Sequence, residues 1–481
     1  MRMINPLIIV RILSTILLIE SLIFMFCIPV ALIYKEPLYP FLLSTAITGF
    51  FCIIFHFTSL RADIHKISNR DGYLAVTISW LILSLMGSLP YLISRTIPSL
   101  NDAFFESVSG FTTTGASIFT DVEVLPYSIL FWRSLTHWIG GIGIIVLVII
   151  ILPSLKITAQ QLFSFESSLK EKIHPKTKAI GLRLLFVYLG LTIIEVLFLY
   201  LGDMNLFDSI CHSFGTVATG GFSTKNASIT NYSAYSQYII TIFMFLSGVS
   251  FTIYYFIVKL QFSKVRQNEE LWFYSATVLV AGIMAAAILL LHTGKPAELA
   301  FREGFFQVIS IITTTGFSTT DYLFWPSAGI LLIFMLLFAG ASTGSSTGSI
   351  KMARHWIVLK NIQKIFIKLI HPSAITQIKI NKKPVSDRTN ISVISFVLFY
   401  IFIFLTGTIM TVLTGVDPVS AASGAASMLG NVGPGLGTIG PMNNYAHIPE
   451  FSKFIFSLLM ITGRLEIYTI FIIFGNSFWK L

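Results

Sequence analysis

Four short loops rich in glycine and threonine recur along the chain, each directly after a short apolar stretch. They read FTTTGAS at 111–117, VATGGFS at 217–223, TTTGFST at 313–319 and GNVGPGLG at 430–437. Glycine relaxes the limits on φ and ψ, so successive backbone carbonyls can point to one side of the chain. Rings of such carbonyls replace the water shell of an alkali cation in potassium channels. We therefore expect the loops to line one cation pore with internal fourfold pseudosymmetry.

One glycine in each loop stands at a nearly regular interval from the next. By subtraction of positions, the intervals are 105, 96 and 117 residues. The glycines that we place in the pore are Gly115, Gly220, Gly316 and Gly433.

The composition places these loops in a bilayer. The chain has 481 residues, of which 54% are hydrophobic and 11% charged, and its mean hydropathy is +0.81. A soluble domain carries roughly a quarter of charged residues. Cys27, Cys52 and Cys211 lie in apolar segments without metal-ligand spacing and are interpreted as small buried hydrophobes.

The net charge of +10 does not indicate nucleic-acid binding, because the basic residues gather in alternate connections between apolar segments. The connections that carry the glycine loops are nearly free of them. This asymmetry is the positive-inside rule, and it places the basic connections and the N-terminus in the cytoplasm. The basic clusters are Arg61 to Arg70, Lys156 to Arg183, Lys259 to Arg266 and Lys351 to Arg388.

Ten apolar runs are long enough, at about 20 residues, to span a bilayer. They fall at 7–34, 38–60, 72–96, 124–152, 182–202, 233–260, 271–293, 327–360, 391–415 and 448–478. Four shorter apolar segments, at 102–112, 205–217, 301–313 and 417–430, precede the glycine loops and are too short to cross. We interpret them as re-entrant pore helices, since irregular backbone at membrane depth is tolerated only beside a wet cavity.

Polar residues near the start of these short segments suit N-terminal capping of short helices. They are Asp102, Asn205 or Asp208, Glu303 and Asp417. We predict an all-α polytopic membrane protein with ten transmembrane helices. A two-helix unit at 1–70 precedes four helix–pore-helix–filter–helix repeats at 71–180, 181–268, 269–388 and 389–481.

Several longer stretches carry a family resemblance. They are FFESVSGFTTTGAS at 104–117, HWIGGIGIIVLVIIILP at 137–153, EKIHPKTKA at 171–179, NVGPGLG at 431–437 and GRLEIYT at 463–469. In this order and spacing they resemble the TrkH/TrkG family, the membrane subunits of bacterial Trk potassium uptake systems. The resemblance runs essentially from end to end and includes the two leading spans.

The resemblance implies a potassium selectivity filter in which the loop residues supply carbonyls or hydroxyls. These residues are Thr112, Thr113, Thr114, Gly115, Val217, Ala218, Thr219, Gly220, Thr313, Thr314, Thr315, Gly316, Asn431, Val432 and Gly433. Those expected to touch the potassium ion are Thr113, Thr114, Ala218, Thr219, Thr314, Thr315, Asn431 and Val432. In plant relatives a serine at the first filter glycine accompanies sodium preference, so Gly115 favours potassium.

The run GASTGSSTGS at 340–349 breaks the eighth apolar run, because ten residues of Gly, Ser, Thr and Ala disfavour a helix. It is either a small-residue packing face or, as the resemblance implies, an intramembrane loop that obstructs the pore beneath the filter. The residues assigned to this gate are Gly340, Ser342, Thr343, Gly344, Ser345, Ser346, Thr347 and Gly348.

Arg464 is a charged residue inside the last apolar run, where a charge is costly and faces a cavity or a partner. One interpretation is a structural pair with a distant acid. The other, which the resemblance implies, is a positive barrier in the ion path as part of the gate. Arg133 and His137, four residues apart on one helix face, are interpreted as structural.

Two other classes of function are weighed against a potassium-translocating subunit. A secondary transporter of a different solute usually has two repeats with half-helices at the midplane, rather than four carbonyl-type loops. An enzyme needs a cluster of catalytic or metal-binding side chains, and the nine histidines are scattered. We therefore expect no enzyme and no organic cofactor, only the potassium ion.

The resemblance further implies a bacterial inner-membrane location, a homodimer and a separate cytoplasmic nucleotide-binding regulatory subunit of the TrkA type. The basic segments at 156–183 and 351–388 are candidate docking surfaces for that subunit, or contacts for lipid headgroups.

Overall fold

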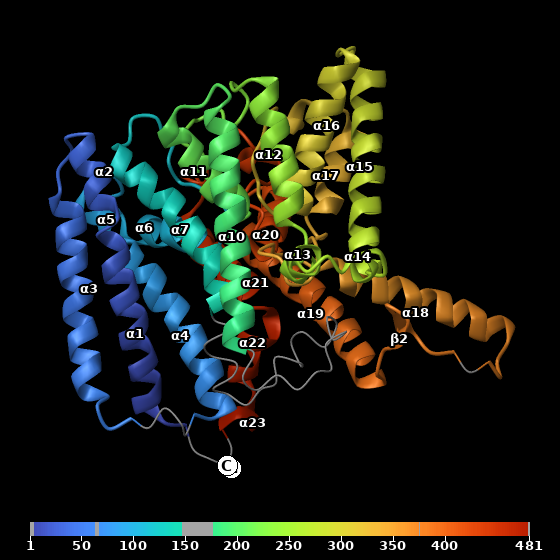
Figure 1. The fold of residues 1–481 in the computed structure, drawn as a ribbon, viewed down its shortest axis with the longest axis horizontal. Coiled ribbons are helices and arrows are strands. Elements are labelled where there is room, and N and C mark those ends of the chain that lie inside the picture. Colours follow the sequence, from blue (N-terminus) through green and yellow to red (C-terminus); the bar gives the residue numbers. More distant parts are fainter. Residues whose placement is uncertain (1–3, 63–66, 147–176, 375, 480–481) are drawn as a thin grey trace.

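The computed structural model describes residues 4–62, 67–146, 177–374 and 376–479. These residues are predominantly helical, as predicted (Figure 1). One small antiparallel hairpin pairs β1 (Lys379–Ile380) with β2 (Lys383–Pro384). The predicted basic segment at 156–183 lies largely outside the described residues, as does the end of the predicted 124–152 span beyond Val146.

The N-terminal unit stands at one side of the bundle, beside the first glycine loop's helices (Figure 1). Its helices are α1 (Pro6–Phe24), α2 (Cys27–Ile33) and α3 (Tyr39–Thr58). The next helices, α4 (Asn69–Gly87) and α5 (Leu89–Ile93), fall in the predicted first repeat. Ser68 and Asp71 form a capping box at the start of α4. Asp71 Oδ1 also accepts a hydrogen bond of 2.7 Å from Asn5 N, which joins the first turn of α4 to the residue before α1.

Each glycine loop follows a short helix, as the sequence predicts. These helices are α6 (Leu100–Phe111), α11 (Leu206–Val217), α16 (Ala297–Ile312) and α20 (Pro418–Gly430). Asn205 and Asp417 cap α11 and α20 through their side chains. Two predicted starts are wrong: Ser99 caps α6, with Asp102 in the first turn, and α16 begins well before Glu303. Glu303 instead pairs with Lys295 Nζ at 2.5 Å.

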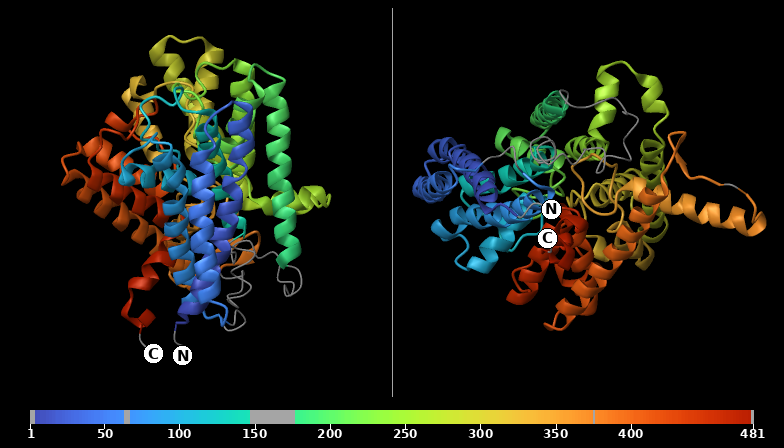
Figure 2. Two further views of the ribbon diagram at one scale, coloured as in Figure 1. Left: turned by 90° about the vertical axis from the view of Figure 1, so that its left-hand side faces the viewer. Right: turned by 90° about the horizontal axis from the view of Figure 1, so that it is seen from below.

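The other main helices pack around these four, with irregular breaks between several of them (Figure 2). They are α7 (Tyr127–Val146), α10 (Thr177–Tyr200), α12 (Ala234–Ser247), α13 (Phe251–Val258), α15 (Glu269–Thr293), α17 (Ser327–Leu336), α18 (Met352–Ile370), α19 (Asp387–Val412), α21 (Glu450–Arg464) and α22 (Ile467–Phe471). The remaining short elements are α14 (Phe262–Arg266), α23 (Asn476–Trp479) and the 3-10 turns η3 (Tyr322–Phe324), η4 (Gly437–Ile439) and η5 (Ile472–Phe474).

Among the described residues, five helical stretches are long and apolar enough to cross a membrane, and two bent pairs raise this to seven. The bends, of 93° between α12 and α13 and 109° between α21 and the α22–η5 stretch, divide the predicted spans 233–260 and 448–478. The predicted span 327–360 is also interrupted, as its Gly- and Ser-rich run predicts. α17 ends at Leu336, and α18 leads sideways out of the bundle (Figure 1).

The bundle buries many polar groups beside its apolar core, and its outer surface is apolar. Hydroxyls on the short helices are buried, including Ser107, Ser109 and Thr216. Large apolar side chains on the outer helices are exposed, such as Leu22, Phe50 and Leu291. Lipid tails can cover such an outer surface, so this distribution suits a protein of the bilayer.

We predict that Gly304→Ala lowers the thermal stability of the detergent-solubilised protein, because a Cβ there would lie 2.8 Å from the backbone nitrogen of Ala286 on α15. The added methyl group would have to displace the backbone of α15, which cannot move aside as a flexible side chain can. Gly190→Ala on α10 is the matched control, since a Cβ there has nothing within 4 Å. Because alanine is favoured over glycine in a helix by up to about 1 kcal/mol, Gly190→Ala should not lower the melting temperature. Equal melting temperatures for Gly304→Ala and the unmodified protein would contradict the close crossing of α15 and α16.

Candidate ion-conducting site

The four glycine loops leave their short helices in the same conformation. In each loop, one backbone N–H donates to the carbonyl five residues earlier: Thr114 to Ser109, Gly220 to Gly215, Thr315 to Ser310 and Val432 to Ser427, at 2.7–2.9 Å. The residue before each donor has a positive φ of 53–57°; these residues are Thr113, Thr219, Thr314 and Asn431. The shared geometry shows that the four loops are true structural repeats.

The shared geometry corrects the predicted register of the second loop. The residue after each donor is a glycine with φ between 78° and 103°: Gly115, Gly221, Gly316 and Gly433. Gly221 therefore takes the place that the sequence analysis gave to Gly220, and Gly220 matches Thr114. Val217 falls at the end of α11, one residue too early. The error arose because two adjacent glycines offer two alignments.

These glycines join the loops into a closed ring. A Cβ built on each would lie about 2 Å from a carbonyl oxygen of the next loop: Gly115 against Gly220 O (2.2 Å), Gly221 against Thr315 O (1.9 Å), Gly316 against Val432 O (2.1 Å) and Gly433 against Thr114 O (2.4 Å). The last contact returns to the first loop. Only glycine fits at these four positions, because any side chain would displace a neighbouring carbonyl.

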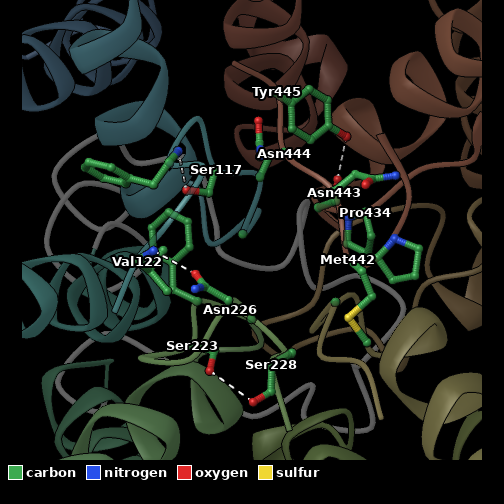
Figure 3. Close-up of a pocket in the computed structure, with 18 of the residues that line it drawn as sticks. Ser117, Val122, Ser223, Asn226, Ser228, Pro434, Met442, Asn443, Asn444 and Tyr445 are labelled. Atoms are coloured by element: carbon green, nitrogen blue, oxygen red, sulfur yellow. Dashed lines mark hydrogen bonds between the residues drawn. The ribbon is translucent and has the colours of Figure 1, made fainter. Parts of the chain in front are cut away.

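A cavity opens on one side of this ring, and all four ring glycines contribute to its lining. Figure 3 shows other residues of its walls, among them Ser117, Asn226 and Pro434. The walls carry neutral polar groups, among them Asn226, Asn443 and Asn444. The described residues that line it include two cations, Arg133 and Lys225, and no acid. The cavity can therefore hold water and a hydrated ion without binding the ion tightly by charge.

Side chains around the cavity fix the loops where they leave the ring. Tyr445 and Tyr322 donate 2.7 Å hydrogen bonds to the carbonyls of Gly433 and Gly435 in the fourth loop. Asn226 bridges the first two loops: its Oδ1 accepts from Val122 N and its Nδ2 donates to Asp121 Oδ1, both at 2.7 Å. The hydrogen bond from Asn226 lowers the pKa of the exposed Asp121 carboxyl.

A buried ion pair joins α6 to α7, and its arginine also contacts the second loop. Arg133 Nε lies 2.8 Å from Glu106 Oε1, and both side chains are buried. Glu106 also accepts from Ile118 N at 2.9 Å, while the Arg133 guanidinium lies 4.1 Å from the ring centre of Phe222. Removing one partner of such a pair leaves a buried charge uncompensated, so both are required together.

His137 makes a second link between the same loops. Its Nδ1 lies 2.9 Å from Gly110 O, and its Nε2 lies 3.2 Å from Phe222 N. A carbonyl can only accept and a backbone N–H can only donate, so the imidazole is neutral with its proton on Nδ1. The structural interpretation of Arg133 and His137 thus agrees with their contacts.

The irregular segment between α17 and α18 lies against the opposite side of the ring from the cavity. We call residues 337–351 the intramembrane segment. Ser346 Oγ donates to Val217 O at 3.2 Å, and Gly348 N donates to Thr314 Oγ1 at 2.9 Å. A Cβ on Gly348 would lie 2.2 Å from Gly430 O. The segment therefore touches the second, third and fourth loops directly.

The other residues assigned to the gate also lie in this segment and hold it in a compact turn. Gly340 N donates to Ile350 O at 2.9 Å, and Ser345 Oγ contacts Ser342 O and Thr347 Oγ1 at 2.7 and 2.8 Å. Gly344 has a φ of 80° and accepts from Phe251 N at 3.1 Å. The predicted helix break is confirmed.

Arg464 joins the intramembrane segment to α7. Its guanidinium donates to Ser346 O at 2.6 Å and to Gly140 O at 2.8 Å. Arg464 is 4% exposed, and no acid pairs with it among the residues that the structure describes. Within the described residues, its partners are thus backbone carbonyls and not the side chain of an acid. The sequence could not reveal the real partners, because they are backbone carbonyls.

Asn431 has a role that its loop position did not predict. Its Nδ2 donates to Thr114 Oγ1 at 3.0 Å and to Met460 O at 2.9 Å. The side chain thus links the fourth loop to the first loop and to α21. In the described part of the chain, no group of three or more His, Cys, Asp or Glu residues could hold a metal ion.

Comparison with known proteins agrees with this arrangement. The family model TrkH, described as a cation transport protein, matches residues 43–480. The Trk system potassium uptake protein TrkH of Halomonas elongata is 34% identical over 98% of this chain and 99% of its own length. TrkG of Escherichia coli, also named a Trk system potassium uptake protein, is 32% identical over 94% of each chain.

A solved structure is similar over the whole length. It is the crystal structure of the potassium transporter TrkH from Vibrio parahaemolyticus, with a TM-score of 0.91 and 32% sequence identity. The alignment covers 99% of this chain and 100% of that one. By sequence and by fold, the chain belongs to the TrkH family of cation transport proteins.

Proposed function

We propose that the chain is the potassium-translocating membrane subunit of a Trk-type uptake system, and not an enzyme. The observation that carries this proposal is the closed ring, in which each of four glycines lies against a carbonyl of the next loop. The names of the relatives support potassium as the ion. Uptake of rubidium into vesicles, blocked by potassium but not by amino acids or sugars, tests it.

In this proposal the ring is the selectivity filter. A hydrated potassium ion enters the cavity and loses its water shell to carbonyls of the loops. With the corrected register, the ion-facing groups belong to Thr113 and Thr114, Thr219 and Gly220, Thr314 and Thr315, and Asn431 and Val432. Thr112, Ala218 and Thr313 stand one position further from the cavity. The alternative of a secondary transporter for another solute is not favoured by a four-loop ring.

We further propose the complete membrane topology. Ten spans form a leading pair and four repeats in the bacterial inner membrane, with the N-terminus in the cytoplasm. The observations behind this are the four matching loop conformations and the long apolar helices. The cavity beside the ring glycines then faces outward, and the intramembrane segment faces the cytoplasm.

The intramembrane segment is proposed as the gate, because it touches three of the four loops on their inner side. Its Gly and Ser content keeps it from forming a stable helix, so it can move. Arg464 holds it in place and puts a positive charge beside the ion path. Opening then requires that the contacts from Arg464 to Ser346 are broken.

Partners are proposed from the family relationship. We propose a cytoplasmic nucleotide-binding regulator of the TrkA type and a homodimer in the bilayer. The basic region 351–388, with α18 and the β-hairpin, projects from the bundle and is available for docking (Figure 2). No part of the proposed function needs an organic cofactor.

We predict that Gly115→Ser and Gly221→Ser each reduce the preference for potassium over sodium by about tenfold, or roughly 1.4 kcal/mol. A side chain at either position would displace a carbonyl of the neighbouring loop. The reversal potential under bi-ionic conditions measures the preference. Gly190→Ser, in open space on α10, is the control. An unchanged reversal potential for folded Gly221→Ser would remove that glycine from the filter.

We predict that Arg464→Ala raises cation flux several-fold and leaves selectivity intact. The change removes the hydrogen bond to Ser346 O of the intramembrane segment and the one to Gly140 O of α7, each worth about 1 kcal/mol or more, together with a positive charge. Flux per folded protein in liposomes is measured beside thermal stability in detergent. Arg266→Ala, at an exposed position on α14, is the control. Lower stability with unchanged or reduced flux would contradict the gate role of Arg464.

A further inference from the structure

Two adjacent glutamates begin α15 and hold two segments that lie far away in the sequence. Glu270 contacts the intramembrane segment, and Glu269 contacts the β-hairpin, which we define as residues 378–385. Neither residue belongs to the ring. Their contacts connect the proposed gate with the part of the chain that projects into the cytoplasm in the proposed topology.

The Glu270 carboxylate binds two backbone N–H groups. Its Oε1 accepts from Thr343 N at 2.6 Å and from Ala353 N at 3.1 Å. Thr343 lies in the intramembrane segment, and Ala353 lies in the first turn of α18. First-turn N–H groups have no partner within their own helix, and the positive end of the helix favours a carboxylate. Glu270 therefore closes residues 343–353 into one fixed turn.

Lys351, the last residue of the intramembrane segment, stabilises the same turn. Its Nζ contacts Thr347 O and lies 2.9 Å from Thr347 Oγ1. The intramembrane segment is thus held at Thr343 by Glu270, at Ser346 by Arg464 and at Thr347 by Lys351. Of these three side chains, only that of Glu270 comes from α15, and it binds with a charge-assisted hydrogen bond.

Glu269 and Asn381 form a reciprocal pair. Asn381 N donates to Glu269 Oε1 at 2.9 Å, and Glu269 N donates to Asn381 Oδ1 at 2.8 Å. Asn381 and Lys382 form the tight turn of the β-hairpin, with φ of 49° and 64°. Glu269 Oε2 also accepts from Trp356 Nε1 at 2.9 Å and contacts Lys360 Nζ. The hairpin and α18 are therefore both fixed to the first residue of α15.

We propose that Glu270 is a positioning residue for the gate, and that the β-hairpin sets the position of Glu270 through Glu269. The inference rests on the proposed role of the intramembrane segment as the gate. The two glutamates are neighbours on one rigid helix, so a displacement of the hairpin moves both. A contiguous chain of contacts then runs from Asn381 through the start of α15 to Thr343.

The test uses the full chain in liposomes, with a cysteine at Ser345→Cys as reporter of the intramembrane segment. Ser345 is 5% exposed, and the native cysteines in the described residues are all buried. The rate of labelling by a small methanethiosulfonate reagent is measured together with rubidium flux. We expect Glu270→Ala to raise the labelling rate about fivefold or more and to raise flux. Glu270→Gln, which keeps an acceptor but not the charge, should have a smaller effect.

Asn381→Gly tests the link between the β-hairpin and Glu269. Glycine keeps the positive φ of the turn and removes the side-chain oxygen that accepts from Glu269 N. Lys382→Gly is its matched control, at the neighbouring positive-φ position. We expect Asn381→Gly to raise labelling and flux above the level of Lys382→Gly. Both hairpin variants change only the turn, so they remain informative if Glu270→Ala fails to fold.

The outcomes distinguish the proposed role of Glu270 from the proposed gating role of the intramembrane segment. We call the hold of Glu270 on the intramembrane segment the tether. An unchanged labelling rate in folded Glu270→Ala overturns the tether. If the alanine variant does not fold, an unchanged rate in Glu270→Gln does so. Raised labelling with unchanged flux supports the tether and overturns the proposed gate. Equal labelling in Asn381→Gly and Lys382→Gly overturns the coupling to the hairpin. Raised labelling and flux in the glutamate variants and in Asn381→Gly support the whole inference.

Discussion

The structure depends on one constraint: irregular backbone in the middle of a membrane protein must satisfy its hydrogen bonds without bulk water. Each glycine loop meets this need with its own short helix, because one loop N–H donates to the carbonyl five residues back. The positive φ angles on either side of that donor are a consequence of this turn. The same geometry brings the loops so close that only glycine fits between them.

The four repeats share this backbone, but different side chains hold each of them in place. The first two loops are joined by Arg133, which pairs with Glu106 and lies over the ring of Phe222, and by the neutral His137. The fourth is held by Tyr445 and by the amide of Asn431. One chain can vary its side chains from repeat to repeat, which an assembly of identical subunits cannot do. The ring is therefore symmetric where the loops meet and asymmetric around them.

Much of this arrangement could be predicted from the sequence, because glycine loops, apolar runs and helix caps are local signals. The four short helices and the helix break at 340–349 are in the structure as predicted. The register of the second loop could not be predicted, since both Gly220 and Gly221 satisfy the local pattern. The partners of Arg464 and Glu270 could not be predicted either. They are backbone groups, and because residues of almost every type carry these groups, the sequence gives no signal for them.

The ring and the intramembrane segment are held by different kinds of contact. Loop backbone is fixed by hydrogen bonds within each repeat, so moving it would break the turn itself. The intramembrane segment has hydrogen bonds of its own, but its contacts with the other helices come from long side chains, Arg464 on α21 and Glu270 on α15. Long side chains can release a backbone group at the cost of a few hydrogen bonds, each with a net worth of about 1 kcal/mol. If the ring is the filter and the segment is the gate, as we propose, a rigid ring beside a releasable segment lets ion selection and gating change independently.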